Sequence, residues 1–283
     1  KGGHRPIFGA DWAEDPALPR VTEIHGGSTV NIVPLESDAW VEGLALETIL
    51  EHCARESKKT GVQFGAVEEG GLIHIHALGE SAHAASPEGG KNAQTALLAL
   101  LASLPLAPSA GQKAICDLSR LFPYGDNHGT ALGVNQEDAI SGRLTLVFSK
   151  LTFTKTGFEG QYDSRCPICA TNDNMRAVSE KNLNACGFTF RKKPDMYAPH
   201  HTPAESDLCQ TLLRTYEDYT GQKGYCVAIG GGTYVHEIPG GVAFGAEFPG
   251  EENHMHGADE RIRTESLLLN ARIFAHAVKA LCE

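Results

Sequence analysis

The sequence predicts an α/β protein with two domains, or with one domain that carries a large insertion. At 283 residues the chain is longer than one typical domain and can bury substantial cores. Segments with strand-like alternation and segments with helical periodicity follow one another, and a helix–strand unit recurs around residues 46–93 and again around 144–186. Hydrophobic residues make up 41% of the chain and charged residues 21%, which are ordinary proportions for a globular protein.

The first two elements are a strand and a helix. Residues 20–33 alternate in strand fashion, with a bulge or tight turn expected at Gly26-Gly27. Residues 46–58 repeat apolar side chains at helical spacing, and Gly61 is placed to end that helix. The helix face expected to be buried consists of Leu46, Ile49, Leu50 and Cys53.

A second strand and helix follow. Residues 72–79 alternate apolar side chains with histidine, as a half-buried strand does. We expect His74 and His76 on the polar face of that strand, as sheet surface and not as metal ligands. The turn-rich residues 79–93 then lead into a helix rich in alanine and leucine. Its buried face is predicted to comprise Ala93, Ala96, Leu97, Leu100, Leu101 and Leu104.

The middle of the chain contains a predicted pair of strands. Residues 105–141 are rich in turn residues and give no clear element. Residues 144–153 alternate strongly and predict a strand, which a turn joins to a second strand ending at 161–167. A helix is then predicted over residues 175–186, where Gly187 ends it.

Two helices are predicted in the C-terminal third. Residues 202–205, Thr-Pro-Ala-Glu, have the pattern of a capping box with proline at the first helical position, and predict a helix to about Tyr219 that Gly221 ends. Thr264 is expected to cap the last helix. Its apolar stripe, which we expect to pack on a sheet, comprises Leu267, Ala271, Phe274, Val278 and Leu281.

Charge and hydropathy argue against two classes of partner. The net charge of −11 and a pI near 5.6, without a cluster of lysine and arginine, argue against nucleic acid. No apolar run approaches the ~20 residues that span a bilayer, and residues 1–6 lack the apolar core of a signal peptide. We therefore expect a cytoplasmic protein without a membrane partner.

Eight cysteines are scattered along the chain, so free thiols are expected. Cys166 and Cys169 have the C-P-x-C spacing of a dithiol redox motif, which requires the first thiol to lie where a helix begins. Turn residues 170–174 follow instead, and no second cysteine pair lies nearby to complete a zinc site. We expect no function for this pair.

The stretch richest in chemistry is residues 230–260. Three consecutive glycines, Gly230 to Gly232, let the backbone approach a ligand more closely than side chains would permit. His254 and His256 share one face if that segment is extended, and nearby carboxylates could orient them. A His-x-His pair alone is more often a surface pair than a metal site.

Three ordered motifs resemble the M20 family of zinc peptidases, especially its PepV-like dipeptidases. Over residues 230–260 the sequence G-G-G-T-Y, then V-A-F-G, then F-P-G-E-E with M-H, then A-D-E follows the order of the family's C-terminal end. Residues 79–93 are similar to the family's lid motif G-x-S-A-H-A at about eight ordered positions, including the later P, G and N-A. Residues 163–167 match its D-x-R-x-P strand.

The resemblance implies roles for individual residues. His256 would be a zinc ligand. His83 would donate a hydrogen bond to the oxyanion of the tetrahedral intermediate, a contact worth about 3 kcal/mol of the barrier. Arg165 would bind the terminal carboxylate of the substrate, a task that suits the guanidinium fork. The remaining substrate contacts would come from Asn31, Gly231, Gly232 and Thr233.

The resemblance also implies a domain arrangement. Residues 6–193 would form a lid of two α/β, ferredoxin-like halves, and residues 194–283 the C-terminal half of an α/β zinc-peptidase catalytic domain, with residues 1–5 a remnant of that domain. The family's H-x-D pair, bridging aspartate and Glu-Glu pair lie outside this sequence. The chain is thus similar to the C-terminal ~60% of a dipeptidase.

The activity implied for the complete enzyme is metal-dependent hydrolysis of dipeptides with a free C-terminal carboxylate. Two zinc ions would be its cofactors, a small peptide its substrate, and a doubled lid that reaches its own site would let it act as a monomer. The 283-residue chain alone is expected to be inactive. The alternatives are an N-acyl amino acid hydrolase of the same family and a non-catalytic binding protein derived from it.

Overall fold

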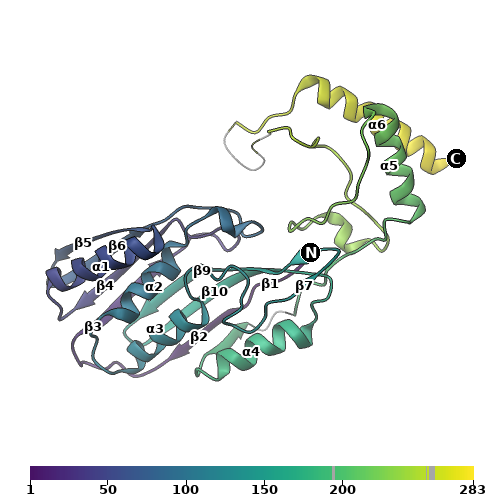
Figure 1. The fold of residues 1–283 in the computed structure, drawn as a ribbon. Helices are drawn as coiled ribbons and strands as arrows, with labels where there is room; N and C mark the ends of the chain where they lie inside the picture. The colour runs from purple at the N-terminus through teal and green to yellow at the C-terminus, as the bar shows by residue number, and fades with distance from the viewer. Residues whose placement is uncertain (193–194, 253, 255–258) are drawn as a thin grey trace. The chain divides into compact units, whose positions relative to one another are not determined.

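The computed structural model describes residues 1–192, 195–252, 254 and 259–283, and divides into two compact units. Unit 1 comprises residues 1–199 and 229–231, and unit 2 comprises residues 200–228 and 232–283 (Figure 1). Unit 1 contains every strand that the described residues form, whereas unit 2 contains two helices and long connecting segments. No helix in the described ranges has the length and apolar character needed to cross a membrane.

Unit 1 is a mixed α/β body built on one antiparallel sheet, which confirms the α/β prediction. The strand order is β11-β2-β10-β9-β3-β4-β6-β5, and β1 pairs with the end of β10 beside β2. The sheet strands are β1 (Gly2–His4), β2 (Ile7–Asp11), β3 (Arg20–Gly26), β4 (Glu36–Glu42), β5 (Gln63–Glu69), β6 (Leu72–Leu78), β9 (Thr145–Thr154), β10 (Gly157–Cys166) and β11 (Thr189–Lys192). A separate two-stranded ribbon consists of β7 (Glu137–Asp138) and β8 (Gly142–Arg143).

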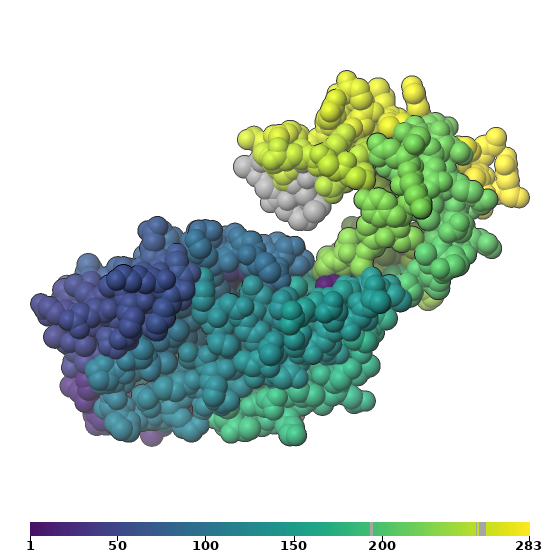
Figure 2. Space-filling model, in the orientation of Figure 1, coloured from purple at the N-terminus to yellow at the C-terminus, as the bar shows by residue number. Residues whose placement is uncertain are grey.

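Three helices cover one face of this sheet: α1 (Leu46–Thr60), α2 (Ala93–Ser103) and α3 (Ala110–Leu121) (Figure 1). Their side chains close over the sheet into a continuous surface (Figure 2). The helix α4 (Ala177–Asn184) packs beside β11. The core lies between the helices and the sheet, and every residue of the face predicted for α2 is buried in it. Asn92 starts α2 because its side chain accepts a hydrogen bond from the Thr95 amide.

Two sequence-based expectations for unit 1 need correction. In α1 the buried residues are Ile49, Cys53 and Glu56, whereas Leu50 is 43% exposed, because the buried stripe repeats at i, i+4 and i+7 and Leu50 lies about 100° around the helix from it. The second is α3, which the sequence did not indicate. Ser109 caps this helix and its buried face consists of Ala114, Ile115, Leu118 and Leu121, but the prolines and glycine around its start resemble a loop.

A β-bulge sets the register of the central hairpin. Along β9 and β10, Gln161 pairs with Lys150 but Tyr162 pairs with Phe148, so Ser149 is an extra residue on β9. The Ser149 hydroxyl donates a hydrogen bond to the Gln161 carbonyl at 3.2 Å and is fully buried. Beyond the bulge, Arg165 pairs with Thr145.

Unit 2 contains α5 (Asp207–Thr220) and α6 (Thr264–Cys282), which pack together. The predicted capping box at 202–205 is wrong: Ser206 caps α5, since its side chain accepts from the Cys209 amide, and residues 203–206 form a turn before the helix. The predicted end is correct, because Gly221 has a positive φ of 66°.

The stripe predicted to bury α6 is also wrong in this structure. Residues Leu267, Ala271, Phe274, Val278 and Leu281 are exposed, Val278 by 60%. The buried residues are Ser266, Asn270, Ile273 and Ala277, on another face of the same helix. Polar contacts fix this face: the Asn270 amide donates to the Ala246 carbonyl at 2.5 Å, and the Ser266 hydroxyl donates to Glu251 at 2.5 Å. The exposed stripe is therefore an apolar helix face without a sheet against it among the described residues.

Candidate functional site

The loop between β6 and α2, residues 79–92, is closed at its base by strand-like contacts. The amides of Glu80 and Lys91 each donate to the other's carbonyl, at 3.0 and 2.8 Å, and their side chains form an ion pair. Gly79 is required here because a Cβ at this position would lie 2.0 Å from the Lys91 carbonyl oxygen. We call residues 82–86 at the far end of this loop the lid loop.

The lid loop pairs with the segment that follows β3. Ile32 and His83 form an antiparallel bridge; the Val33 amide donates to the Ala82 carbonyl at 2.8 Å, and the Ala84 amide to the Asn31 carbonyl at 2.9 Å. Asn31 and His83 are therefore neighbours, although about fifty residues of chain separate them. The two residues that the sequence assigned to substrate and oxyanion contacts are brought together.

Small apolar residues hold the lid loop to the sheet. Ala84 is fully buried and packs with Val33 and Val147 of β9, with Ala82 beside them. The Thr145 hydroxyl donates to the Ala84 carbonyl at 2.8 Å, so β9 also anchors the loop through a buried hydrogen bond. Larger side chains in the alanine-rich motif would not fit this contact.

His83 is exposed, and one ring nitrogen has a clear assignment. The Ala85 amide donates to His83 Nδ1 at 3.2 Å, so Nδ1 is an acceptor. The neutral imidazole then carries its proton on Nε2. A ring held in this tautomer by its own loop is suited to donating one hydrogen bond through Nε2.

Arg165 lies at the end of β10, with its side chain only 7% exposed. Its Nε donates to Asp163 Oδ1 at 2.6 Å and its Nη2 to Oδ2 at 3.2 Å, forming a bidentate pair with a fully buried carboxylate. Its Nη1 donates to the Gly230 carbonyl at 2.5 Å. Arg165 is therefore a buried guanidinium held in a fixed orientation, and its ion pair with Asp163 does not lie at the surface.

The glycine turn meets the lid loop at Gly230. A Cβ on Gly230 would lie 2.7 Å from the Ala85 Cβ, so only glycine permits this approach. Gly231 also belongs to unit 1, whereas Gly232 and Thr233 belong to unit 2. Thr233 caps a 3₁₀ helix (Tyr234–Glu237) in a reciprocal capping box with His236, so its side chain has a local structural role.

Unit 1 thus gathers Asn31, His83, Arg165 and the Gly230-Gly231 backbone around β9 and β10. Their catalytic and binding roles stay predictions, and so do those of Gly232 and Thr233. His256 lies outside the described residues. Two residues that the sequence analysis did not single out also support this cluster, namely Thr145, which anchors the lid loop, and Asp163, the buried partner of Arg165. The i, i+2 spacing of Asp163 and Arg165 on one strand face was the available signal for the last of these.

Other candidates have structural roles. His74 Nε2 and His76 Nδ1 both contact Asp38 Oδ1, at 2.8 and 2.9 Å, on the polar face of the sheet where they were expected. Burial raises the pKa of the Cys166 thiol to about 11, and burial also raises that of Cys169, which is the opposite of what a redox nucleophile requires. Within the described ranges no three histidine, cysteine or carboxylate side chains form a group that could hold a metal.

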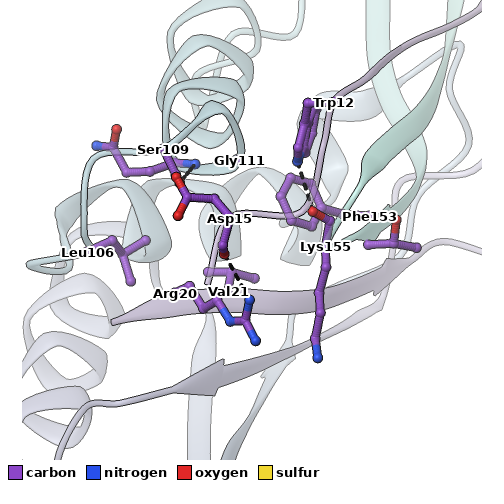
Figure 3. A pocket seen from close by; sticks show the side chains of 11 residues that line it. Trp12, Asp15, Arg20, Val21, Leu106, Ser109, Gly111, Phe153 and Lys155 are labelled. Carbon is purple, nitrogen blue, oxygen red and sulfur yellow. Dashed lines mark hydrogen bonds between the residues drawn. The ribbon is translucent and has the colours of Figure 1, made fainter. Parts of the chain in front are cut away.

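A pocket lies elsewhere in unit 1, at the start of α3 (Figure 3). Trp12 Nε1 donates to the Lys155 carbonyl at 3.0 Å on one side of it, and Arg20 Nη1 donates to the Asp15 carbonyl at 2.8 Å on another. The pocket shares no residue with the cluster around β9 and β10.

Comparison with known proteins gives two informative relatives. The chain is 32% identical over 281 residues to the putative dipeptidase YtjP of Bacillus subtilis, covering 99% of this chain and 58% of that protein. It is 30% identical over 261 residues to the Beta-Ala-Xaa dipeptidase of Lactobacillus delbrueckii subsp. lactis, covering 90% of this chain and 54% of the relative. The chain therefore spans little more than half the length of these relatives.

The aminoacylhistidine dipeptidase of Vibrio alginolyticus superposes with a TM-score of 0.48 at 15% identity, over 99% of this chain and 61% of that one. No protein-family model matches the chain. The sequence relatives are named as dipeptidases, and it is to dipeptidases that this chain is similar.

Proposed function

We propose that this chain is part of a zinc-dependent dipeptidase of the M20 type, which hydrolyses dipeptides that carry a free C-terminal carboxylate. The observation that carries the proposal is the pairing of the lid loop with residues 31–33, which sets His83 beside Asn31 in the unit that also holds Arg165. The names of the two sequence relatives support the same reaction. Residues 6–193 would act as a lid of two α/β, ferredoxin-like halves.

Three side chains of this chain would contribute directly. His83 Nε2–H would donate to the oxyanion that forms when the peptide carbonyl is attacked, and Asn31 would contact the substrate beside it. Arg165, fixed by Asp163 and Gly230, would bind the substrate carboxylate without having to change rotamer. The reacting peptide bond would lie between these two ends of the site.

Zinc does not fit the described residues by themselves, since they supply no group of three ligands. We therefore derive no step through the metal. In a protein of the relatives' length, His256 would be one ligand, and the others would come from the part of the relatives that this chain does not match. The exposed apolar stripe of α6 supports the assignment of residues 194–283 to a catalytic domain that is completed by further polypeptide.

A chimera tests the proposed function. The segment of the Bacillus subtilis relative that this chain does not match, joined to the chain, should yield a zinc-dependent monomer that cleaves dipeptides faster than N-acetyl amino acids. His83→Ala should lower its kcat by roughly 10²-fold or more. Preference for N-acetyl amino acids would contradict the dipeptidase assignment, and an obligate dimer in sedimentation would contradict the monomer.

The 283-residue chain alone should not hydrolyse peptides in added zinc. The control is the same chain with His256→Ala, because its 13 histidines could bind zinc adventitiously elsewhere. Turnover by the chain that this substitution abolishes would show that all the ligands come from within it, and the proposal of a shared site would be wrong.

A further inference from the structure

The buried Asp163 carboxylate pairs with a second arginine, Arg5. In the antiparallel register of β1 and β10, His4 pairs with Ser164, so Arg5 follows opposite Asp163. Arg5 Nε lies 2.8 Å from Asp163 Oδ2, while Arg165 occupies Oδ1 and shares Oδ2. One fully buried carboxylate thus separates two guanidinium groups.

The cluster carries an excess positive charge. Asp163 neutralises one of the two guanidinium groups, and no other carboxylate in the described part of the chain pairs with Arg5 or Arg165. Arg20 shows the contrary arrangement in the same sheet, because it pairs with both Glu14 and Glu42. In a chain of net charge −11, an arginine pair that shares a single carboxylate is a local excess of positive charge, which attracts anions.

The hydrogen-bond donors of the two arginines are used differently. Arg165 is 7% exposed and already commits its Nε, Nη1 and Nη2 to Asp163 and Gly230. Arg5 contacts Asp163 through Nε, and its side chain is 46% exposed. The Nη1 and Nη2 groups of Arg5 make no hydrogen bond or ion pair with the described residues, and together they form an edge of the guanidinium that can bind a carboxylate through two hydrogen bonds.

We propose that Arg5 is a second carboxylate-binding residue, which together with Arg165 takes the C-terminal carboxylate of the peptide ligand. Asp163 holds both guanidinium groups in place, and its carboxylate leaves the site with a net charge of about +1. The inference rests on the proposed function for the identity of the ligand. It goes beyond that function in assigning the exposed half of the site to Arg5.

Binding to the 283-residue chain tests this without catalysis. Calorimetric titration should show that alanyl-alanine binds at least about 10-fold more tightly than its C-terminal amide, since a charge-assisted pair is lost with the amide. Arg5→Gln should remove most of this difference, and Arg5→Lys should restore part of it. Arg20→Gln is the matched control and should leave the difference intact, and thermal unfolding of each variant checks that the chain is folded.

Each outcome decides between the two ideas. If the chain does not distinguish alanyl-alanine from its amide, or if Arg5→Gln leaves the difference unchanged, Arg5 does not bind the carboxylate. If Arg5→Gln removes the difference but the chimera hydrolyses no dipeptide, the carboxylate site stands and the proposed function fails. If the chimera hydrolyses dipeptides and Arg5→Gln leaves its KM unchanged, the function stands and the role of Arg5 is refuted.

Discussion

Replacing Asp163 by asparagine should destabilise unit 1 by about 3–5 kcal/mol, the usual result of removing one partner from a buried ion pair. The Asp163 side chain is 0% exposed and that of Arg165 only 7%, so solvent cannot replace the lost charge. Asparagine is nearly isosteric, but its amide nitrogen would face guanidinium donors in place of an acceptor oxygen. The cost is therefore electrostatic and not a packing defect.

Urea unfolding of the 283-residue chain, followed by the far-ultraviolet circular dichroism of the sheet, measures this loss. Asp11→Asn is the matched control. Asp11 pairs with Arg191 at 2.5 Å in the same sheet, but the two side chains are 75% and 33% exposed, so its loss should cost no more than about 1 kcal/mol. If the two substitutions shift the free energy of unfolding equally, the buried pair does not stabilise the end of β10 and the reasoning is refuted.

Three further predictions follow from local geometry. Gly27→Ala should lower the free energy of unfolding by more than about 2 kcal/mol, because φ is +70° and a Cβ would lie 1.8 Å from a backbone oxygen of β9. The control is Gly70→Ala, with φ +59° and open space around the position, which should cost about 1 kcal/mol. Equal losses for the two variants would contradict the clash at Gly27. Thr145→Val should accelerate amide hydrogen exchange in the lid loop by removing its buried anchor; unchanged exchange there would mean that packing alone holds the loop. At pH 8, Cys166 should be alkylated more slowly than the exposed Cys169. The alkylation rate of Cys166 should rise about tenfold for each pH unit up to about pH 10, because the thiolate is the reactive form. A rate independent of pH would contradict the raised pKa of this thiol.

The same thiol predicts the sign of a stability change. The pKa of Cys166 is about 11 in the folded chain, above its ordinary value of 9.0, because burial disfavours the thiolate. Its contribution is fully present below pH 9 and is lost as the pH rises towards 11, since the unfolded thiol ionises first. Cys166→Ala should flatten this part of the stability profile in denaturant unfolding, and an unchanged slope would refute the assignment.

The sequence predicted elements well where one periodicity is uninterrupted, as in α2 and β9. It failed at α3, where a capping serine is surrounded by proline and glycine that resemble a loop. In α6 the helix was correct but its buried face was not, because apolar residues occur on two sides and periodicity does not say which side meets a neighbour.

In the candidate site, too, the sequence did not predict which residues contact one another. The motifs singled out His83, Asn31 and Arg165 individually, but their proximity depends on strand pairing that no local pattern encodes. The contact between Arg5 and Asp163 depends on the register of β1 against β10, which no local pattern fixes because residues 5–156 separate the two strands. Residue types are therefore predictable here, whereas their partners are not.

The bulge at Ser149 determines which residues of β9 lie opposite the C-terminal end of β10. Side chains alternate between the two faces of a strand, so a regular ladder in which Ser149 paired with Tyr162 would bring Arg165 opposite Leu146 and turn Thr145 away from the Ala84 carbonyl. Deleting Ser149 would remove the bulge and leave Thr145 opposite Arg165. One residue added between Thr145 and Phe148 would shift this pairing, and should be far more harmful than lengthening the exposed turn between β9 and β10. The tolerance of this hairpin to insertions and deletions therefore depends on where along the hairpin they fall, and less on the number of residues changed.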